Sequence, residues 1–128
     1  MTIQPGSVIF YLYGGATFSE PIVIKDADGT PVDLTNYTAK MQVRRDISDT
    51  ATVMDLATGG QGITLGGIAG TIALDLNSTN SAALNIDQDG EVWVYDLQLI
   101  DLTNTTDGAP YVERTIQGAI IASPPVTR

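Results

Sequence analysis

The chain has 128 residues, a length that suits one domain with a single apolar core. It contains no cysteine and no histidine, which excludes disulfides and thiolate chemistry and removes the commonest general base and transition-metal ligand. Six basic residues against fifteen acidic ones give a net charge of −9, which disfavours nucleic-acid binding and favours solubility at high concentration.

Neither a membrane span nor an export signal is apparent. The apolar runs are all shorter than the roughly 18 residues that a bilayer requires. Residues 1–6 lack the basic patch and the apolar stretch of a secretory signal. We therefore expect synthesis in a cytosol and no membrane partner.

Short segments in which apolar and polar residues alternate run from the start of the chain, separated by Gly, Asp, Asn and Pro. We expect a first strand at 7–13, ended by Gly14 and Gly15, and a second strand over 17–25. Pro21 places the second strand at a sheet edge or a bulge, because proline cannot donate to the hydrogen-bond ladder.

The clearest strand spans residues 37–45, where alternate residues form an apolar face typical of a half-buried antiparallel strand. Weaker or shorter strands follow at 51–56, 63–65 and 71–76. A helical turn is expected only near residues 78–85, where Ser78 or Thr79 can cap it.

The longest strand is expected over 91–102, followed by a polar loop at 103–109 and further strands at 111–116 and 119–122. Seven to nine strands, with turn signals about every 8–12 residues, predict a single all-β domain, an antiparallel β-sandwich. We expect one sheet to supply Tyr37, Met41 and Val43 to the core and the other to supply Trp93, Tyr95 and Leu97. The predicted core also includes Ile72, Leu74 and Leu99.

Two features are candidates for chemistry, and each has a plainer interpretation. The turns at 26–29 and 87–90 are similar to the opening of calcium loops, but neither completes the ligand spacing, and Asp and Gly are common turn residues. Asp75 and Asp96 could form a carboxylate pair. Both, however, alternate with the apolar residues of their strands, so we expect their side chains to point outward into solvent. We expect no catalytic residues, no cofactor and no metal.

Three arginines are candidates for protein contact. Arg44 and Arg45 end the clearest strand, and Arg128 ends the chain. An arginine here can pair with a local carboxylate such as Asp46 or dock against an acidic partner. Intramolecular pairing is favoured for Arg44, while both interpretations stay open for Arg45 and Arg128.

Several segments together resemble one known family. The run from Gly29 to Arg44, GTPVDLTNYTAKMQVR, is similar to a signature of small tailed-bacteriophage virion proteins. Later segments also resemble theirs, namely GTIAL at 70–74, WVYDLQL at 93–99, RTIQG at 114–118 and the closing VTR. In order and spacing they resemble the N-terminal immunoglobulin-like domain of siphophage baseplate upper proteins, although Asn36 stands where the family usually has Gly.

The resemblance covers roughly residues 17–128 and implies an immunoglobulin-like sandwich there. Residues 1–16 match nothing in that family and are expected to form an N-terminal strand or an arm within the same single domain. The implied function is that of a non-enzymatic structural protein of the virion, an adaptor at the tail, baseplate or fibre attachment. The implied partners are other virion proteins (fibre, baseplate, tail or capsid subunits) and further copies in a homo-oligomer.

Two alternatives remain open. A capsid cement protein, which decorates the head shell, fits the same resemblance. A carbohydrate-binding β-sandwich is the alternative from another class, with Trp93 or the tyrosines Tyr11, Tyr13 and Tyr111 stacking on sugar, although Trp93 has core parity. For protein contacts, the first strand and the C-terminal segment are the best candidates, with the residues Ser7, Ile9, Tyr11, Tyr13, Arg45, Pro124, Pro125 and Arg128.

Overall fold

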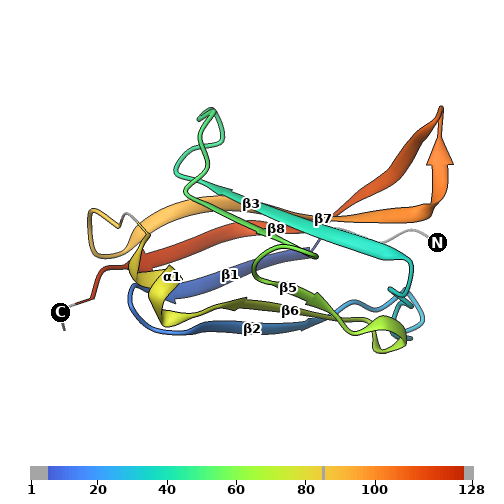
Figure 1. Ribbon diagram of the computed structural model, residues 1–128, viewed down its shortest axis with the longest axis horizontal. Helices are drawn as coiled ribbons and strands as arrows, with labels where there is room; N and C mark the ends of the chain where they lie inside the picture. Colours follow the sequence, from blue (N-terminus) through green and yellow to red (C-terminus); the bar gives the residue numbers. More distant parts are fainter. Residues whose placement is uncertain (1–5, 85, 126–128) are drawn as a thin grey trace.

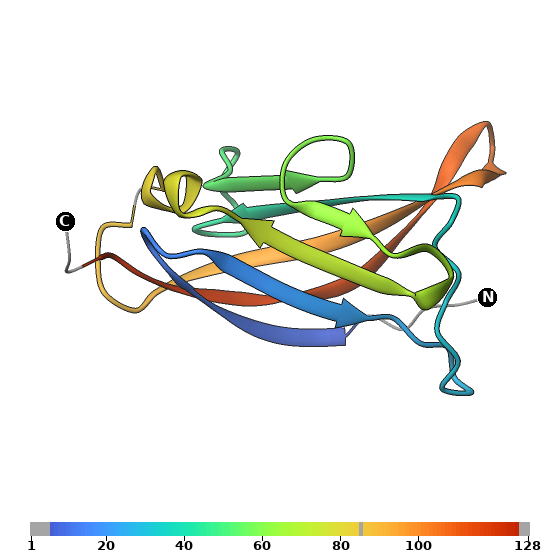
Figure 2. The same cartoon turned by 60° about the horizontal axis from the view of Figure 1, so that its bottom comes forward.

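The computed structural model describes residues 6–84 and 86–125, which form two β-sheets packed face to face (Figures 1 and 2). One sheet has the strand order β1-β8-β7-β3-β4 and the other has the order β2-β6-β5. The described residues form eight strands, one short helix and one 3₁₀ turn: β1 (Gly6–Tyr13), β2 (Phe18–Val23), β3 (Tyr37–Arg44), β4 (Met54–Ala57), β5 (Ile63–Leu65), η1 (Gly67–Ala69), β6 (Thr71–Leu76), α1 (Ser78–Ala82), β7 (Glu91–Thr106) and β8 (Ala109–Ser123).

This strand order confirms the predicted immunoglobulin-like β-sandwich. The orders β8-β7-β3-β4 and β2-β6-β5 correspond to the G-F-C-C′ and B-E-D sheets of variable-type immunoglobulin domains. The first strand departs from the antiparallel expectation, because β1 runs parallel to β8, from Gly6 opposite Ile116 to Tyr13 opposite Ser123. Alternation along a strand reports which face is buried but not the direction of the neighbouring strand. The predicted N-terminal strand or arm is, over the part described, a strand of the larger sheet.

The core lies between the sheets and consists of the inward residues of both. Nearly all of the predicted core residues are buried, namely Met41, Val43, Ile72, Leu74, Trp93, Tyr95, Leu97 and Leu99. Tyr37 is only partly buried, because it is the first residue of β3 and packs at the margin of the core. Since the chain has no cysteine, the two sheets are not joined by the disulfide of antibody domains, and apolar packing holds them together.

The predicted division of the core between the sheets is wrong. Met41 lies opposite Leu97, and Val43 lies opposite Tyr95, so both groups of residues belong to adjacent antiparallel strands of one sheet. The opposite side of the core comes from β2, β5 and β6, with Ile72 and Leu74 at its centre. Parity gave the correct face for each residue but carried no information about which sheet contains it.

The β7–β8 hairpin is longer than the sequence predicts. Residues expected to form a polar loop at 103–109 are mostly strand. After an irregularity between Asp101 and Thr105, pairing resumes with Thr105 opposite Pro110 and Thr106 opposite Ala109. Asp107 and Gly108 have φ values of 53° and 83°, as a two-residue type I′ turn requires. The end of this hairpin projects beyond the sandwich (Figure 1). The strands predicted at 111–116 and 119–122 are parts of the single strand β8.

The helical turn forms where it is expected but has a different cap. The side chain of Asn77, rather than Ser78 or Thr79, accepts a hydrogen bond from the backbone of Asn80 at 2.7 Å. Ser81 on this helix is fully buried; its hydroxyl donates to the Tyr13 carbonyl and accepts from the Gly15 amide, both at 3.1 Å. α1 thereby holds the turn between β1 and β2 at one end of the sandwich.

A tyrosine that reaches over a glycine anchors β1. Tyr95 on β7 lies opposite Gly118 on β8, and its hydroxyl donates to the Val8 carbonyl on β1 at 2.6 Å. Gly118 has a φ of 155°, and a β-carbon there would overlap the same carbonyl oxygen. The ring of Phe10 packs 5.4 Å from that of Tyr95 and 6.1 Å from that of Phe18 on β2, so β1 also contacts the second sheet.

A β-bulge interrupts β8 beside this anchor. Leu97 lies opposite Ile116 while Gln98 lies opposite Arg114, so Thr115 is the extra residue and is buried together with Ile116. The Thr115 hydroxyl has no hydrogen-bond partner within residues 6–84 and 86–125. A buried hydroxyl without a partner destabilises the folded state.

The first prediction concerns the Tyr95 hydroxyl. Tyr95→Phe should lower the free energy of unfolding by about 1–2 kcal/mol in urea denaturation, because it removes the bond to Val8. Burial raises the pKa of Tyr95 above its ordinary value of 10.0. The folded state therefore holds this proton more tightly, and its contribution to stability, complete below pH 10, is lost as the pH rises toward the raised value. Wild type should lose more stability above pH 10 than Tyr95→Phe does. Equal losses would contradict the assignment.

The second prediction concerns the close approach at Gly118. Gly118→Ala should abolish hydrogen-exchange protection in β1, because the new methyl group overlaps the Val8 carbonyl. Gly90→Ala is the matched control, since Gly90 also has positive φ but has open space around its α-carbon. The control should lose about 1 kcal/mol and keep β1 protected. Loss of β1 protection in both variants would show that backbone strain, and not the contact, is responsible.

The third prediction compares two buried hydroxyls. Thr115→Val should raise the free energy of unfolding by about 1 kcal/mol, because the variant keeps the shape and removes the unpaired hydroxyl. Ser81→Ala, which removes a hydroxyl with two partners, should lower it by about 1–2 kcal/mol. Both are measured by urea denaturation, and destabilisation by Thr115→Val would show that its hydroxyl is satisfied.

Candidate interaction surface

The outward side of β1 is uncharged and largely apolar. Ile9, Tyr11 and Tyr13 are exposed by 56%, 54% and 59%, and Ser7 is exposed as well. The alternate residues Phe10 and Leu12 are buried in the core. Four of the residues predicted for protein contact therefore form one row on the surface. The alternate residues of the same strand pack in the core and fix the position of this row.

This row continues across the two neighbouring strands. Tyr11 lies opposite Ile121 on β8, which lies opposite Val92 on β7, and Val92 is 57% exposed. Together these outward residues form the outer apolar patch: Ile9, Tyr11, Tyr13, Val92, Val94, Ala119 and Ile121. On β3 the outward residues are polar, so the patch ends there. Val92 and Ile121 were missed as contact candidates, although their parity, opposite to that of Trp93 and Ile120, was the signal that could have found them.

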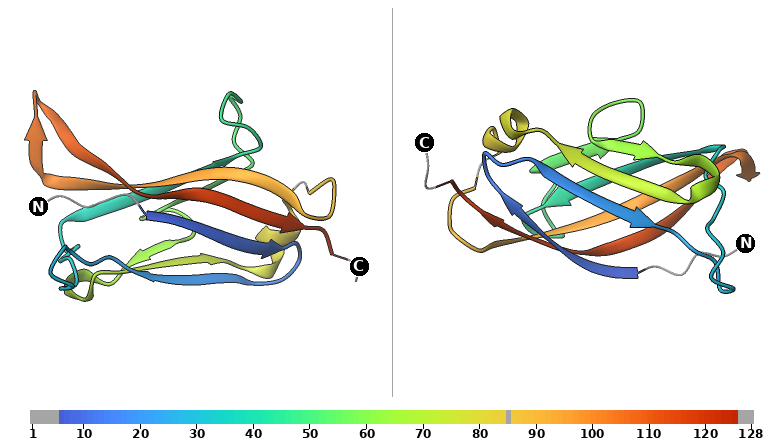
Figure 3. Two further views of the ribbon diagram at one scale, coloured as in Figure 1. Left: turned by 180° about the vertical axis from the view of Figure 1, so that it is seen from behind. Right: turned by 90° about the horizontal axis from the view of Figure 1, so that it is seen from below.

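β1 is also the longest edge strand of the two sheets. The edge strands β4 and β5 have four and three residues, and the Ala57 amide at the end of β4 donates to the Gln61 carbonyl of the following loop at 2.8 Å. The edge strand β2 has six residues and contains Pro21. β1 has eight residues with neither proline nor charge. Seen from below, it lies at the margin of the molecule beyond β2 (Figure 3). Long, uncharged, exposed edges are the ones that accept another strand.

Of the two C-terminal prolines, Pro125 packs against the turn that ends β1. Pro124 and Pro125 are partly buried, and a β-carbon on Gly14 would lie 3.1 Å from the Pro125 ring. The Gly14 amide donates to the Ser123 carbonyl at 2.8 Å. These prolines therefore lie beside the predicted contact strand, which makes them part of the same end of the molecule. Arg128, the remaining C-terminal candidate, lies outside the described residues.

Arg45 pairs within the chain. Its guanidinium contacts the Glu91 carboxylate, lies 3.6 Å from that of Asp87 and sits 5.9 Å from the centre of the Trp93 ring. Glu91 also accepts from the Trp93 indole at 2.8 Å and from the Asp87 amide at 3.0 Å. Of the two interpretations open for Arg45, the structure shows intramolecular pairing. A role of Arg45 in docking stays a prediction.

Arg44 lies on the outer face and does not form the expected carboxylate pair within the described part of the chain. It donates to the Gln42 side chain at 3.3 Å. The Asp46 carboxylate instead accepts from the hydroxyl and the amide of Ser48, and these hydrogen bonds lower the pKa of Asp46. A shallow pocket beside Arg44, under the loop that carries the exposed Ile47, borders the outer apolar patch at Val94.

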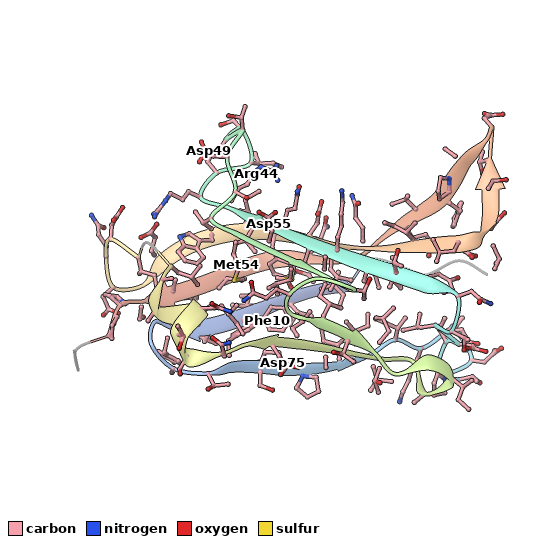
Figure 4. All side chains as sticks on the ribbon, viewed as in Figure 1. Phe10, Arg44, Asp49, Met54, Asp55 and Asp75 are labelled. Carbon is pink, nitrogen blue, oxygen red and sulfur yellow. The ribbon has the colours of Figure 1, made fainter. Side chains whose placement is uncertain are left out.

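The carboxylates considered for chemistry lie apart from one another. Asp75 is on the outer side of the three-stranded sheet, where it accepts from the Ser19 hydroxyl at 2.8 Å, whereas Asp96 is on the five-stranded sheet. Figure 4 shows Asp75 and Arg44 on opposite sides of the molecule.

In the turn at 26–29, Asp26 accepts from two backbone amides of its own turn, those of Asp28 and Thr30. Among the described residues, no group of three or more acidic side chains could hold a metal ion. Nor is any helix in that part of the chain long and apolar enough to cross a membrane.

Trp93 cannot serve as a sugar platform in this fold. It is fully buried, and its indole nitrogen is bound to Glu91. The Tyr111 hydroxyl donates to Glu113 at 2.9 Å, and this hydrogen bond raises the pKa of Tyr111. Tyr11 and Tyr13 are the exposed tyrosines of the carbohydrate alternative, and both lie in the outer apolar patch.

Comparison with known proteins identifies no family for this chain. No protein-family model matches the chain, and no curated protein matches it. Among solved structures, the extracellular domain of the voltage-gated sodium channel beta4 subunit aligns over 98% of this chain and 99% of that chain. The sequence identity is 11% and the TM-score is 0.43; that structure is of parallel homodimers, linked to a role in cell–cell adhesion. At this similarity, the fold assignment rests on the strand order of the chain itself.

The fourth prediction concerns Glu91, which joins Arg45, Trp93 and the turn at 87–90. Glu91→Ala should lower the free energy of unfolding by about 1–2 kcal/mol in urea and shift the Trp93 fluorescence spectrum, because the indole loses its acceptor. Glu91→Gln keeps an acceptor oxygen and removes only the charge, so it should cost less. Added salt should weaken the ion pair of the wild type, and it should therefore reduce the loss by a similar amount in both variants. Equal effects of the two variants would assign the whole contribution to charge.

Proposed function

We propose that this chain is a non-enzymatic structural protein of a tailed-phage virion, made in the host cytoplasm and acting as an adaptor at the tail, baseplate or fibre attachment. The observation that carries the proposal is the uncharged edge strand β1 with its outer apolar patch. Exposed apolar surface of this kind is retained where a partner covers it. Partners would be other virion proteins and further copies of the chain.

The phage setting is supported by the motif resemblance, and the motif residues have clear structural roles. In the segment 29–44, Val32 and Leu34 are buried, with exposures of 2% and 1%. Asp33, which lies between them, accepts from the amide and the hydroxyl of Thr35, which fixes the turn that leads into Tyr37. These hydrogen bonds lower the pKa of Asp33. The motif thus encodes the entry into β3, an interior strand of the five-stranded sheet.

The mechanism is passive. A rigid sandwich presents an edge strand, and a partner strand can add to it through backbone hydrogen bonds while side chains on the outer apolar patch give selectivity. A capsid cement protein would use the same surface, and copy number separates the two roles. A tail adaptor occurs in small multiples of three or six, whereas a cement protein covers the shell in hundreds of copies.

The test is detection of the chain in purified particles by mass spectrometry, followed by electron microscopy of particles labelled with an antibody against it. We expect labelling at the tail, with a low copy number relative to the major capsid protein. Labelling spread over the head would favour cement. Absence from purified particles would overturn the virion role altogether.

The carbohydrate alternative has its own test. A glycan array should give no reproducible binding to the chain. Binding that is lost in Tyr11→Ala and Tyr13→Ala, but retained in the interior control Thr115→Val, would replace the adaptor proposal with a sugar-binding function at the same surface.

A further inference from the structure

The backbone groups of β1 alternate between two sides. The Val8 carbonyl faces β8, as its contact with the Tyr95 hydroxyl and its closeness to Gly118 show. The Tyr13 carbonyl points the other way, since it accepts from Ser81 and from the Ala16 amide. Within a strand, the amide and the carbonyl of one residue point to the same side, and successive residues alternate. The backbone groups of Ser7, Ile9 and Tyr11 are therefore directed at the free edge.

Charge restricts what can approach this edge. The chain carries a net charge of −9, so two copies repel each other over most of their surfaces. β1 contains no acidic or basic residue, and the neighbouring outward residues Val92 and Ile121 are apolar. A basic partner would gain more by binding the acidic surfaces elsewhere, whereas a second acidic copy can approach closely only where charge is absent.

The length of β1 and its lack of proline also favour a second copy of β1 as the partner. An eight-residue edge is best matched by another of equal length that is free of proline. Neither β4, β5 nor β2 meets this condition, because β4 and β5 are short and β2 contains Pro21. A two-fold axis that brings a strand against its own copy makes an antiparallel pair, and every contact then occurs twice.

We propose that β1 of one copy pairs antiparallel with β1 of a second copy, which joins their two five-stranded sheets into one continuous sheet. The inference rests on the proposed function in taking β1 as the contact strand, and it names the partner at that strand. With the two-fold axis perpendicular to the sheet, both outer apolar patches lie on the same face and adjoin each other. The pair would then present a doubled apolar face to a third protein.

The first experiment measures mass by light scattering and sedimentation on the full chain, from about 1 µM to 1 mM, the range in which small interfaces dissociate. We expect a monomer–dimer equilibrium. Ile9→Pro removes an amide directed at the free edge. Because the substitution is present in both copies of the symmetric dimer, two hydrogen bonds are lost, and the dimer dissociation constant should rise at least about tenfold. Tyr11→Lys, which places a charge at the same edge, should weaken the dimer as well. Circular dichroism confirms that each variant remains folded.

Val92→Lys is the matched control. Val92 is as exposed as Ile9 but lies two strands from the edge, so the dimer should persist in this variant. A dimer that survives Ile9→Pro and is lost in Val92→Lys would be a face-to-face contact and would overturn the pairing. A chain that stays monomeric over the whole concentration range would overturn it too.

Strand direction is tested by single cysteines, which are clean probes because the chain has none of its own. The substitutions are Ser7→Cys, Ile9→Cys, Tyr11→Cys and Tyr13→Cys. In antiparallel pairing, disulfide cross-linking should peak at the residue beside the axis and fall on both sides. Equal cross-linking at all four positions would indicate a parallel pair and contradict the proposal. If the chain is monomeric but is found in particles, the β1 pairing is wrong and the virion role stands. If the chain forms the dimer but is absent from particles, the virion role is wrong and the pairing stands.

Discussion

The position of β1, which carries the exposed contact residues, depends on the hydrogen bond from the Tyr95 hydroxyl to the Val8 carbonyl. β1 is joined to the sandwich along one side only, by a parallel pairing with β8. Tyr95 reaches it from one strand further away, and the absence of a side chain at Gly118 lets the two backbones approach. Phe10 adds packing against Phe18 of the other sheet. Because these inward contacts are satisfied, the outward residues of β1 are free to face a partner without weakening the fold.

The sequence predicted the faces of the strands better than their neighbours. Alternation assigned Met41, Val43 and Trp93 to the core, and all three are buried. It could not tell that β3 and β7 are adjacent, since a residue with inward parity looks the same in either sheet. Thr-rich segments such as 103–106 were interpreted as loop because they are polar, although threonine favours strands and the Asp107-Gly108 turn was visible in the sequence.

The candidate surface was predictable in part for the same reason. The outward parity of Ile9, Tyr11 and Tyr13 could be read directly, and they are exposed as expected. Extension of the patch to Val92 and Ile121 required the register of three strands, which local sequence does not contain. The partner of Arg45 was equally inaccessible, because Glu91 is distant in the sequence and is brought near only by the order of the strands.

The pairing of the first strand with the last has a consequence for synthesis on the ribosome. Gly6 lies opposite Ile116, so β1 emerges long before the strand that holds it has been translated. Closing so long a loop is slow, and until then an uncharged, aromatic segment remains available to neighbouring nascent chains. When several ribosomes translate one mRNA, the exposed β1 segments of neighbouring nascent chains can associate before folding is complete. The excess of acidic residues in the chain opposes such association, because like charges repel.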